Sequence, residues 1–513
     1  MGRTLRGPVN RPALLKSFGE FQRIFGGLWQ PSTLGYAVEQ FFDNGGREAL
    51  IVRVVNGARP ASLTLRAADE TLTLRAVRPG TREFLRASVD YDNIPADNAA
   101  EFNLTLQRVR HHGTEQIEDQ EIFARLSVAP GTERGMADVL GASTLVRIAG
   151  PVPSHRPDRT LDPVSGHSTG YVASNTDGDD GAPLTDYDLI GSKADGSGLF
   201  ALDDAEPFNL LCLPPLDRER DVGPGALLVA LRVCAERRAL LVIDPPVAWL
   251  TADDALRGMK DWNLSSANAL MYFPRILAHD KLRGQCEAFA PGGAVAGMLA
   301  RSDENFPVWG PPQIEDVALR PGYRPSSIVG EDRRLRLAAA GVNTIQSVRS
   351  ATRLGILPRT LAGSSAGAAD WQVLAARRLA LFILNSVERG TRWVTLAGLR
   401  PHLQVADLAA AQVRAFLRKL HDAGAFGARP REEAFFVACD ERVNPPGRAD
   451  ACEFHLVIGF AAVRRREYHS YRIVHSVSGS RISPVSLNQL NFAQWSPAEL
   501  EWAERLADQL RVV

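Results

Sequence analysis

The sequence predicts several domains of the α/β and α+β classes, with an antiparallel β-rich domain inserted near the N-terminus. First, the 513 residues exceed what one hydrophobic core usually organises. Second, continuous apolar segments alternate with helical ones between residues 208 and 273, as in an open parallel sheet covered by helices. Third, apolar and polar residues alternate between residues 61 and 152, as in half-exposed antiparallel strands.

The composition is that of a folded protein without a net charge. Hydrophobic residues make up 45% of the chain and charged residues 23%, which is ordinary for globular domains. Lysine plus arginine number 59, as do aspartate plus glutamate, so no overall field attracts nucleic acid or an anionic membrane. No apolar run approaches the roughly 20 residues of a membrane span. We therefore expect neither nucleic acid nor membrane insertion.

The cysteines show no pattern typical of a disulfide framework or a zinc site. They are odd in number, scattered, and include no C-x-x-C pair. We interpret them as buried thiols in a reducing cytoplasm, since the N-terminal residues also lack an apolar signal core. No metal, no cofactor and no enzymatic activity are expected. The five cysteines are Cys212, Cys234, Cys286, Cys439 and Cys452.

Residues 1–60 are predicted to form an N-terminal αβ segment. Apolar residues repeat at helical spacing over residues 18–25 and again over residues 34–42. Asn44-Gly45-Gly46 then provides a helix stop before an apolar run at residues 49–55, which predicts a buried strand.

The β-rich domain is assigned to residues 61–152 and is followed by a loop or insertion at residues 153–205. His111 and His112 are neighbours in sequence, so their side chains diverge and favour a solvated pair over a metal site. The acidic run at residues 176–181 resembles a calcium loop superficially, but Asp188 stands where an EF-hand needs glutamate.

Residues 206–365 are predicted to form the open α/β domain. Strands are expected at residues 208–213, 239–243 and 268–273, and helices at residues 225–237 and 251–262, the second with a Thr251/Asp254 capping box. A ligand would normally bind at the carboxyl ends of such strands. Those ends instead carry proline, which offers no N–H to an anion. They hold Pro214-Pro215, Pro245-Pro246 and Pro274.

A tightly packed helix is expected to start after Pro291-Gly292-Gly293, because residues 294–299 are small or apolar. Arg301 and Asp303 follow near its end. We expect structural or interface roles for both rather than catalysis.

Residues 366–480 are predicted to form a C-terminal α+β domain, followed by a tail at residues 481–513 with a short helix. The C-terminal domain includes a helix at residues 405–423 and a strand at residues 434–439. Two further segments, residues 453–461 and 467–477, are apolar and β-branched at alternate positions. They predict a hairpin or a strand offered outward. Arg464-Arg465-Arg466 favours a solvated turn over an anion site.

Two patterns suggest a rival hypothesis, a hydrolase of the open α/β type. Residues 363–367 match the G-x-S-x-G nucleophile motif, but they lack the strand-turn-helix context that the motif needs. His279 and Asp280 could be grouped with Ser265 or Ser266 as a triad, yet no glycine-rich nucleophile turn surrounds either serine. The hypothesis would require a pocket with perturbed pKa values at the strand ends.

Five short motifs occur in a fixed order between residues 291 and 379. This series resembles the core of contractile tail sheath proteins, the outer cylinders of contractile phage tails, R-type bacteriocins and related injection machines. Each motif alone is weak, but their order over about ninety residues is specific. The motifs are residues 291–303 (PGGAVAGMLARSD), 308–312 (VWGPP), 341–345 (GVNTI), 359–361 (RTL) and 371–379 (WQVLAARRL).

The resemblance extends from residue 7 to about residue 477 and departs from the family in three places. Segments near the N-terminus match, among them residues 7–12 (GPVNRP) and 41–46 (FFDNGG), but the extended arm that precedes them in the family is expected to be missing. Ile356-Leu357-Pro358 stands where the family commonly has Trp-Gly, and Leu396-Ala397-Gly398-Leu399 replaces an F-E-x-N segment.

The resemblance implies a subtilisin-like but non-proteolytic fold for the α/β domain, and a structural role. A sheath subunit stacks as rings, implied to be hexameric, around an inner tube and contracts to drive the tube through a target envelope. Implied partners are further copies, the tube protein, and baseplate and terminator proteins. The expected location is the cytoplasm during assembly and a tail or injection particle afterwards. A sheath initiator or baseplate-adjacent paralogue is an alternative, and the kind of machine is open.

The resemblance also implies that extended arms of neighbouring subunits add strands to a host hairpin. Strand addition uses main-chain hydrogen bonds, which tolerate pivoting at flexible flanks. We take the two strands between residues 453 and 477 as the host and donor. The candidate inter-subunit residues are Phe454, Leu456, Val457, Tyr468, Tyr471, Ile473 and Val474.

Overall fold

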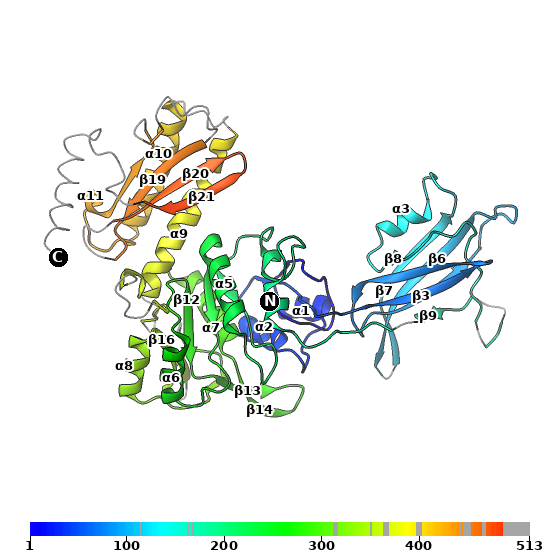
Figure 1. Cartoon of the computed structure of the whole chain (residues 1–513), viewed down its shortest axis with the longest axis horizontal. Helices are drawn as coiled ribbons and strands as arrows, with labels where there is room; N and C mark the ends of the chain where they lie inside the picture. The colour runs from blue at the N-terminus through cyan, green and yellow to red at the C-terminus, as the bar shows by residue number, and fades with distance from the viewer. Residues whose placement is uncertain are drawn as a thin grey trace. The chain divides into compact units, whose positions relative to one another are not determined.

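The chain is a mixed α/β protein with several sheets, divided into two compact units that are described separately (Figure 1). The computed structural model describes residues 1–513 except residues 113, 163, 167–168, 176, 311–316, 349–350, 356, 363–368, 397–402, 441–442, 445–452, 464–467 and 486–513. Unit 1 comprises Met1–Phe208, Cys212–Ala230 and Ala278–Gly297. Unit 2 comprises Asn209–Leu211, Leu231–Leu277 and Met298–Val513. None of the described helices is long and apolar enough to span a bilayer.

Unit 1 begins with a small α/β segment, as predicted. Strand β1 (Ala13–Leu15) pairs antiparallel with β2 (Ala49–Ile51), and helices α1 (Phe18–Phe25) and α2 (Leu34–Asp43) lie between them in sequence. Ser17 caps the start of α1, and Gly26 ends the helix with φ of 92°. The strand expected at residues 49–55 is shorter. Beyond β2, Arg53 still forms isolated bridges with Gly2 and Val9.

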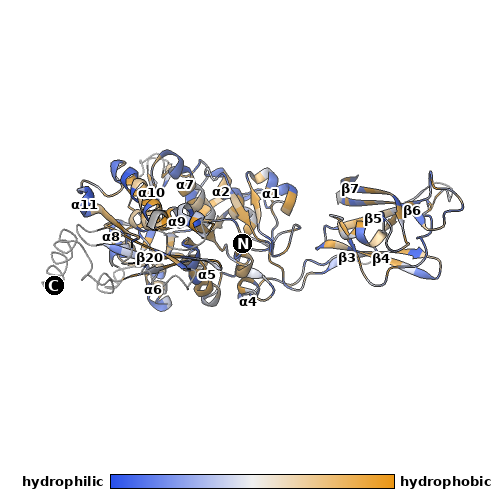
Figure 2. Ribbon diagram, turned by 90° about the horizontal axis from the view of Figure 1, so that it is seen from above, coloured by the Kyte–Doolittle hydropathy of each residue, from blue (hydrophilic) through white to orange (hydrophobic). Residues whose placement is uncertain are grey.

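The β-rich domain of unit 1, strands β3 to β9 with helix α3 (Met136–Gly141), has two sheets that share one core. Apolar and polar residues alternate along its strands (Figure 2), so each sheet buries one face. The antiparallel prediction is confirmed. One sheet has the order β3 (Pro60–Ala67), β4 (Glu70–Pro79), β8 (Val146–Ile148), and the other β7 (Thr114–Ser127), β6 (Glu101–His112), β5 (Phe84–Asp90), β9 (Val172–Ala173).

The segment expected as a loop contains two short helices, α4 (Asp186–Ile190) and η1 (Gly198–Leu202). The Thr185 and Asp188 side chains form a capping box that starts α4. Leu189, Leu199 and Leu202 are buried. The segment is mostly polar and has few apolar residues, so hydrophobic periodicity did not predict these two helices.

The α/β sheet has the order β10-β11-β12-β16-β17. Three neighbouring strands are parallel, which confirms the prediction: β11 (Leu240–Ile243), β12 (Ala269–Phe273) and β16 (Val342–Val348). Strand β17 (Ala351–Leu354) pairs with β16 in antiparallel orientation, because the two form a hairpin. The other elements of this region are β10 (Leu210–Cys212), α5 (Pro224–Arg237), α6 (Ala252–Trp262), β13 (Ile276–Asp280), β14 (Gln285–Phe289), α7 (Gly292–Asn305), β15 (Arg324–Pro325) and α8 (Glu331–Ala339).

The C-terminal part of unit 2 is an α+β layer. The sheet order is β18 (Phe435–Ala438), β19 (Glu453–Phe460), β20 (His469–Ser476), β21 (Gly479–Pro484). One sheet face shares a core with two long helices, α9 (Leu374–Thr391) and α10 (Leu403–Asp422). Shorter helices are η2 (Ala369–Trp371), η3 (Arg392–Thr395) and α11 (Arg431–Ala434).

Candidate inter-subunit site

The two segments proposed as host and donor strands form a hairpin. This is one of the two arrangements that the sequence predicts. Strands β19 and β20 pair antiparallel along their full lengths, with Glu453 opposite Ser476 and Phe460 opposite His469. Alternate residues of β19 point to the helix side, because their apolar side chains join the core with α9 and α10. The arginines of the expected turn, residues 464–466, lie outside the described residues.

The seven predicted residues lie together, but on the inner strands of the sheet. Phe454, Leu456, Val457 and Ile473 are fully buried, and Val474 is 6% exposed. Tyr471 is half-buried in β20. Tyr468, just before β20, donates to the carbonyl oxygen of Glu432 at 3.0 Å. Phe454, Leu456 and Ile473 belong to the core shared with α9 and α10, whereas Val457 lies in a second, smaller cluster. The inter-subunit role of the seven residues stays a prediction.

The sheet has two edge strands among the described residues, β18 and β21, and the sequence analysis missed β21. Ser476 faces Gly479, so Val477 and Ser478 form a two-residue turn between β20 and β21. Ile482 is the one large apolar residue of β21, which makes its alternation weak. The Ser478-Gly479 pair was the available signal, since this dipeptide often marks a turn.

Among the described residues, no strand pairs with the outer backbone edge of β21. The N–H of Val485 donates to the carbonyl oxygen of Ser470 at 2.9 Å. Since N–H directions alternate along an antiparallel strand, Ser480 and Ile482 direct theirs away from β20. Pro484 has no N–H and limits how far an added strand could continue.

A groove of about 820 Å³ lies beside β21 within unit 2, and residues of β19, β20, α5 and α9 line it together with β21. Its walls combine apolar, aromatic and basic side chains, so it suits a strand that alternates apolar residues with polar or acidic ones. Arg377 donates to Oδ1 of Asn268 at 2.6 Å and lies 5.1 Å from the Trp371 ring. Burial lowers the pKa of Arg377, and the neighbouring Tyr471 opposes that shift. Other lining residues include Glu236, Arg238, Leu381, Arg472, Arg481 and Ile482.

A buried histidine joins β21 to the end of helix α9. The ring nitrogens of His475 lie 2.8 Å from the hydroxyl oxygen of Thr391 and 2.8 Å from that of Ser480. The His475 side chain is fully buried. Burial lowers the pKa of His475, with Glu388 acting in the opposite direction. The neutral ring therefore acts as a spacer between helix and edge strand.

Glu388, also near the end of α9, contributes charged contacts. Its side chain is 2% exposed and accepts a hydrogen bond from Nε of Arg392 at 2.6 Å. A second guanidinium, that of Arg238, lies 3.5 Å away and also donates to Asn385. Burial acts to raise the pKa of Glu388, but the two arginines outweigh it and hold the pKa below its usual value. These contacts join the end of α9 to Arg238, which follows α5.

The motif segments of unit 2 are joined through their backbones. Asn343 donates to the carbonyl oxygens of Met271 at 3.1 Å and Arg359 at 2.8 Å, and accepts from the N–H of Arg359 at 2.7 Å. Thr360 donates its hydroxyl to the carbonyl oxygen of Trp371 at 2.6 Å. Such contacts hold strand β16, residues 359–361 and the start of α9 as one scaffold.

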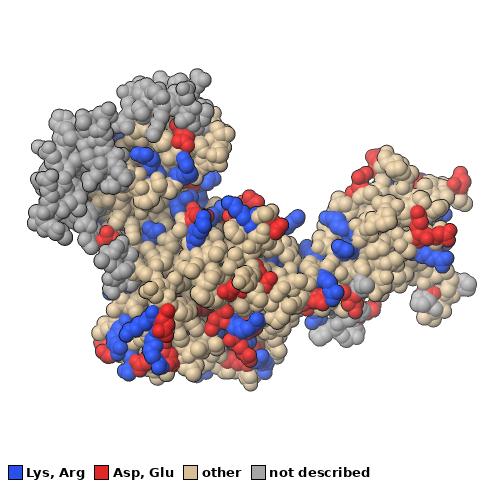
Figure 3. Space-filling view, viewed as in Figure 1, with Lys and Arg blue, Asp and Glu red and all other residues tan. Residues whose placement is uncertain are grey.

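Arg301 and Asp303 have structural partners, as expected. Arg301 donates to the carbonyl oxygen of Ala318, and Asp303 forms an ion pair with Arg378 of α9. Basic and acidic side chains are interspersed over the surface shown in Figure 3, in keeping with the neutral composition.

The residues considered for a hydrolase have local partners. In unit 1, Asp280 is fully buried and accepts from Arg218 at 2.6 Å and from the Tyr36 hydroxyl at 3.1 Å, while His279 is exposed. In unit 2, Ser265 donates to the carbonyl oxygen of Ala362 at 3.0 Å, and Ser266 accepts from the N–H of Asn268 at 3.1 Å. The G-x-S-x-G pattern lies outside the described residues.

The described residues contain no cluster of three or more metal-ligating side chains. The acidic run instead forms turns and ion pairs. Asp179 pairs with Arg59 at 3.0 Å, and Asp180 accepts from the Thr81 hydroxyl at 2.7 Å.

Comparison with known proteins assigns the fold. No family model and no curated protein matches the sequence. Among solved structures, the chain is similar to the sheath tail protein Lin1278 from Listeria innocua, with a TM-score of 0.61 at 12% identity over 92% of this chain and 93% of that one. It is also similar to a sheath tail protein from Desulfitobacterium hafniense, with a TM-score of 0.53 at 12% identity over 93% of this chain and 95% of that one. The chain therefore has the fold of sheath tail proteins.

Proposed function

We propose that the chain is a structural subunit of a contractile tail sheath. The proposal is supported by the shared fold over nearly the whole chain and by the five ordered motifs. In this role, copies stack as hexameric rings around an inner tube and shorten together to push the tube through an envelope. The chain needs no catalytic centre for this work.

The observation that carries the proposal is the open edge of β21 beside its groove. A subunit that binds its neighbour through two different surfaces generates rings or an open helix. We assign the edge as one such surface, to which an arm of a neighbouring copy adds by main-chain hydrogen bonds. The inner strands β19 and β20, with the seven predicted residues, form the rigid host beneath it.

Contraction in this account moves subunits as nearly rigid bodies between two lattices. Close-packed cores transmit strain rather than absorb it, so the free energy resides in the contacts between subunits. We assign residues 206–365 to a subtilisin-like, non-proteolytic domain, which the parallel order of β11, β12 and β16 supports. The other proposed domains and connecting segments are residues 1–60, 61–152, 153–205, 366–480 and 481–513.

The proposed partners are further copies of the chain, an inner tube protein, and baseplate and terminator proteins. Assembly takes place in the cytoplasm, and the finished sheath becomes part of a tail or injection particle.

The test removes one outward N–H of β21 and keeps the hydrogen bonds between β21 and β20. Ile482→Pro deletes one outward N–H of β21 but keeps those of Arg481 and Ser483, which face β20. The matched control, Ile482→Val, keeps the N–H and an apolar side chain. We expect Ile482→Pro to remain folded and to lose assembly, while Ile482→Val assembles. Equal assembly of both variants would refute a role for this edge.

A deletion tests the donor arm separately. Deleting residues 468–513 would remove β20, whose Ile473 is fully buried in the C-terminal core, so loss of assembly would be uninformative. Deleting residues 486–513 leaves every described strand in place. If that shorter chain assembles like the full chain, the donor lies elsewhere.

A further inference from the structure

The β-rich domain is connected to the N-terminal segment of unit 1 by two paired stretches of chain. We call residues 56–59 and 179–182 the neck. Asn56 bridges Ala182, and Arg59 bridges Asp179, both antiparallel. Gly181 has φ of 75°, and a Cβ there would lie 2.2 Å from the carbonyl oxygen of Asn56. The neck is therefore narrow, and by itself it holds the domain through few contacts.

Two buried arginines secure the N-terminal side of the neck. Arg53, which is 1% exposed, donates to the carbonyl oxygens of Gly7 at 2.8 Å and Pro79 at 2.9 Å. Arg3 donates to the carbonyl oxygen of Asp180 at 3.0 Å. Burial lowers the pKa of Arg53 to about 10, so it stays charged at neutral pH. These bonds go to main-chain acceptors and do not depend on any acidic side chain.

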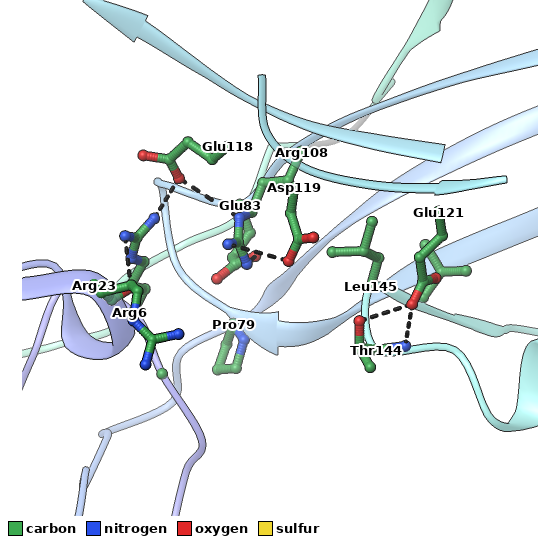
Figure 4. Close-up of polar contacts among 12 residues, drawn as sticks. Arg6, Arg23, Pro79, Glu83, Arg108, Glu118, Asp119, Glu121, Thr144 and Leu145 are labelled. Atoms are coloured by element: carbon green, nitrogen blue, oxygen red, sulfur yellow. Dashed lines mark hydrogen bonds and ion pairs between the residues drawn. The ribbon is translucent and has the colours of Figure 1, made fainter. Parts of the chain in front are cut away.

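A third connection is different, because it joins two charged side chains. Arg6 of the N-terminal segment forms an ion pair with Glu118 on β7 and also donates to the carbonyl oxygen of Arg23 at 2.8 Å, at the end of α1 (Figure 4). The Arg6 side chain is 13% exposed and that of Glu118 15%. The contact lies on the long β6–β7 hairpin, away from the neck in sequence.

Within the β-rich domain, Glu118 belongs to a loose charge cluster. Arg108 lies 3.6 Å from each of Glu83, Glu118 and Asp119, and Arg110 lies 3.5 Å from Glu118. Distances of 3.6 Å exceed ordinary hydrogen bonds. Among the described residues, Nε of Arg108 is buried without a hydrogen-bond partner. If Arg6 withdraws, Arg108 and Arg110 can still neutralise Glu118, which lowers the penalty for opening the contact.

We propose that Arg6 and Glu118 form an ionic latch that holds the β-rich domain against the N-terminal segment and opens without unfolding either part. When the latch opens, the β-rich domain pivots about the neck. High ionic strength favours opening, because salt screens and stabilises the two charges once they separate into solvent, whereas main-chain hydrogen bonds gain no such stabilisation on breaking. This inference concerns one subunit and does not rest on assembly.

Proteolysis of the neck measures the opening directly. The Asp179 side chain is 45% exposed, yet its backbone is paired with Arg59. Endoproteinase Asp-N, which cuts before aspartate, therefore cleaves the Gly178–Asp179 bond when the neck loosens. Glu118→Gln removes the latch charge. Glu115→Gln is the matched control, because Glu115 also lies on β7 but pairs with Arg86 inside the β-rich domain. Cleavage is mapped by mass spectrometry, and thermal unfolding of the whole chain is recorded in parallel.

We expect Glu118→Gln to raise the rate of cleavage before Asp179 by about tenfold, since such cleavage follows the population of the open form. Sodium chloride at about 0.5 M should raise the rate for the wild-type chain and change it much less for Glu118→Gln. Glu115→Gln should match the wild type. Unchanged cleavage in Glu118→Gln would overturn the latch. So would equal new cleavage before Asp90 or Asp119, because cuts in strands β5 and β7 mean that the domain unfolds.

A cross-link gives an independent check. A short bismaleimide joins Arg6→Cys to Glu118→Cys in a chain whose exposed Cys286 is changed to serine. Cleavage before Asp179 should be high without the reagent, because the ion pair is gone, and should fall when the reagent bridges the two positions. Cleavage that stays high in the cross-linked chain would contradict the proposal.

Discussion

Gly297 in helix α7 lies against the carbonyl oxygen of Phe41 in helix α2, so closely that a Cβ at position 297 would stand 2.2 Å from that oxygen. Gly293, one turn earlier, approaches the carbonyl oxygen of Ala37 in the same way, with a Cβ distance of 2.1 Å. Positions four apart lie on one helix face. The glycines of the first motif thus permit backbone contact between α2 and the start of α7 within unit 1.

Gly297→Ala should destabilise unit 1. The new methyl group cannot fit without separating α2 from α7, and overpacking of this kind costs about 1–3 kcal/mol. We expect the urea midpoint of unfolding to fall. Gly225→Ala in α5 is the control, because its Cβ would meet one atom at 3.9 Å. That variant should keep or slightly raise stability, since alanine favours helices. Equal midpoints for the two variants would contradict the packing argument.

The buried His475, which contacts Thr391 and Ser480, should make the stability of the C-terminal layer sensitive to acid. Burial lowers the pKa of His475 in the folded chain, so the unfolded chain binds a proton first as the pH falls. The stabilising contribution is complete above the unfolded pKa of about 6.5 and is lost as the pH falls through the lower folded pKa. We expect less stability at pH 5 than at pH 7.5, measured by urea unfolding followed through tryptophan fluorescence.

His475→Gln separates this effect from general acid destabilisation. Glutamine can still bond to Thr391 and Ser480 but does not titrate. The loss of stability between the two pH values should be smaller in His475→Gln than in the wild type. An identical loss in both chains would show that His475 is not responsible.

Removing the charge of Asp280 should strongly destabilise unit 1. Its carboxylate accepts from Arg218, Tyr36 and the N–H of Leu282, the last at 2.8 Å. Arg218 lies 4.4 Å from the ring of Tyr36 and 4.3 Å from that of Phe289, which contact each other. Breaking a buried pair by altering one partner costs about 3–5 kcal/mol. Asp280→Asn should therefore lower the thermal midpoint by several degrees.

The exposed Arg159–Asp92 pair of unit 1 serves as the comparison for Asp280. The Arg159 side chain is 50% exposed and that of Asp92 69%, although the nitrogen of Arg159 lies 2.9 Å from Asp92. An exposed pair contributes about 0–1 kcal/mol. Arg159→Met should change the midpoint little, and a shift as large as that of Asp280→Asn would argue against burial as the deciding factor.

Asn343 should matter for the scaffold of unit 2. It is 7% exposed, donates two hydrogen bonds to carbonyl oxygens and accepts a third from Arg359. Asn343→Ala leaves those main-chain groups without partners, at about 1–3 kcal/mol for each unsatisfied group. We expect lower stability in urea unfolding. A change below about 0.5 kcal/mol, typical of surface substitutions, would mean that water replaces the amide.

Elements with strong periodicity could be predicted from the sequence. Helices α1 and α2 and the β19–β20 hairpin combine a clear apolar pattern with stops such as Asn44-Gly45-Gly46, so local signals were sufficient. The helix after Pro291 was also expected and appears as α7. The reason for its glycines, contact with Ala37 and Phe41, depends on tertiary structure and is invisible in sequence order.

The open edge of the candidate site could not be identified in the same way. The predicted residues are the most apolar of the C-terminal strands, and burial therefore places them inside the sheet. An edge strand exposes more of its side chains, and β21 has the single large apolar residue Ile482. Likewise, the cluster of Tyr36, Arg218 and Asp280 gathers residues more than 60 positions apart, which no local pattern reveals.

The most direct test of the central claim is electron microscopy of the purified full chain, combined with sedimentation over a wide concentration range. The account predicts hollow cylinders or stacked rings for the wild type and for Ile482→Val, and folded particles that do not assemble for Ile482→Pro. A wild-type chain that sediments as a monomer at every concentration, with and without a candidate tube protein, would contradict it.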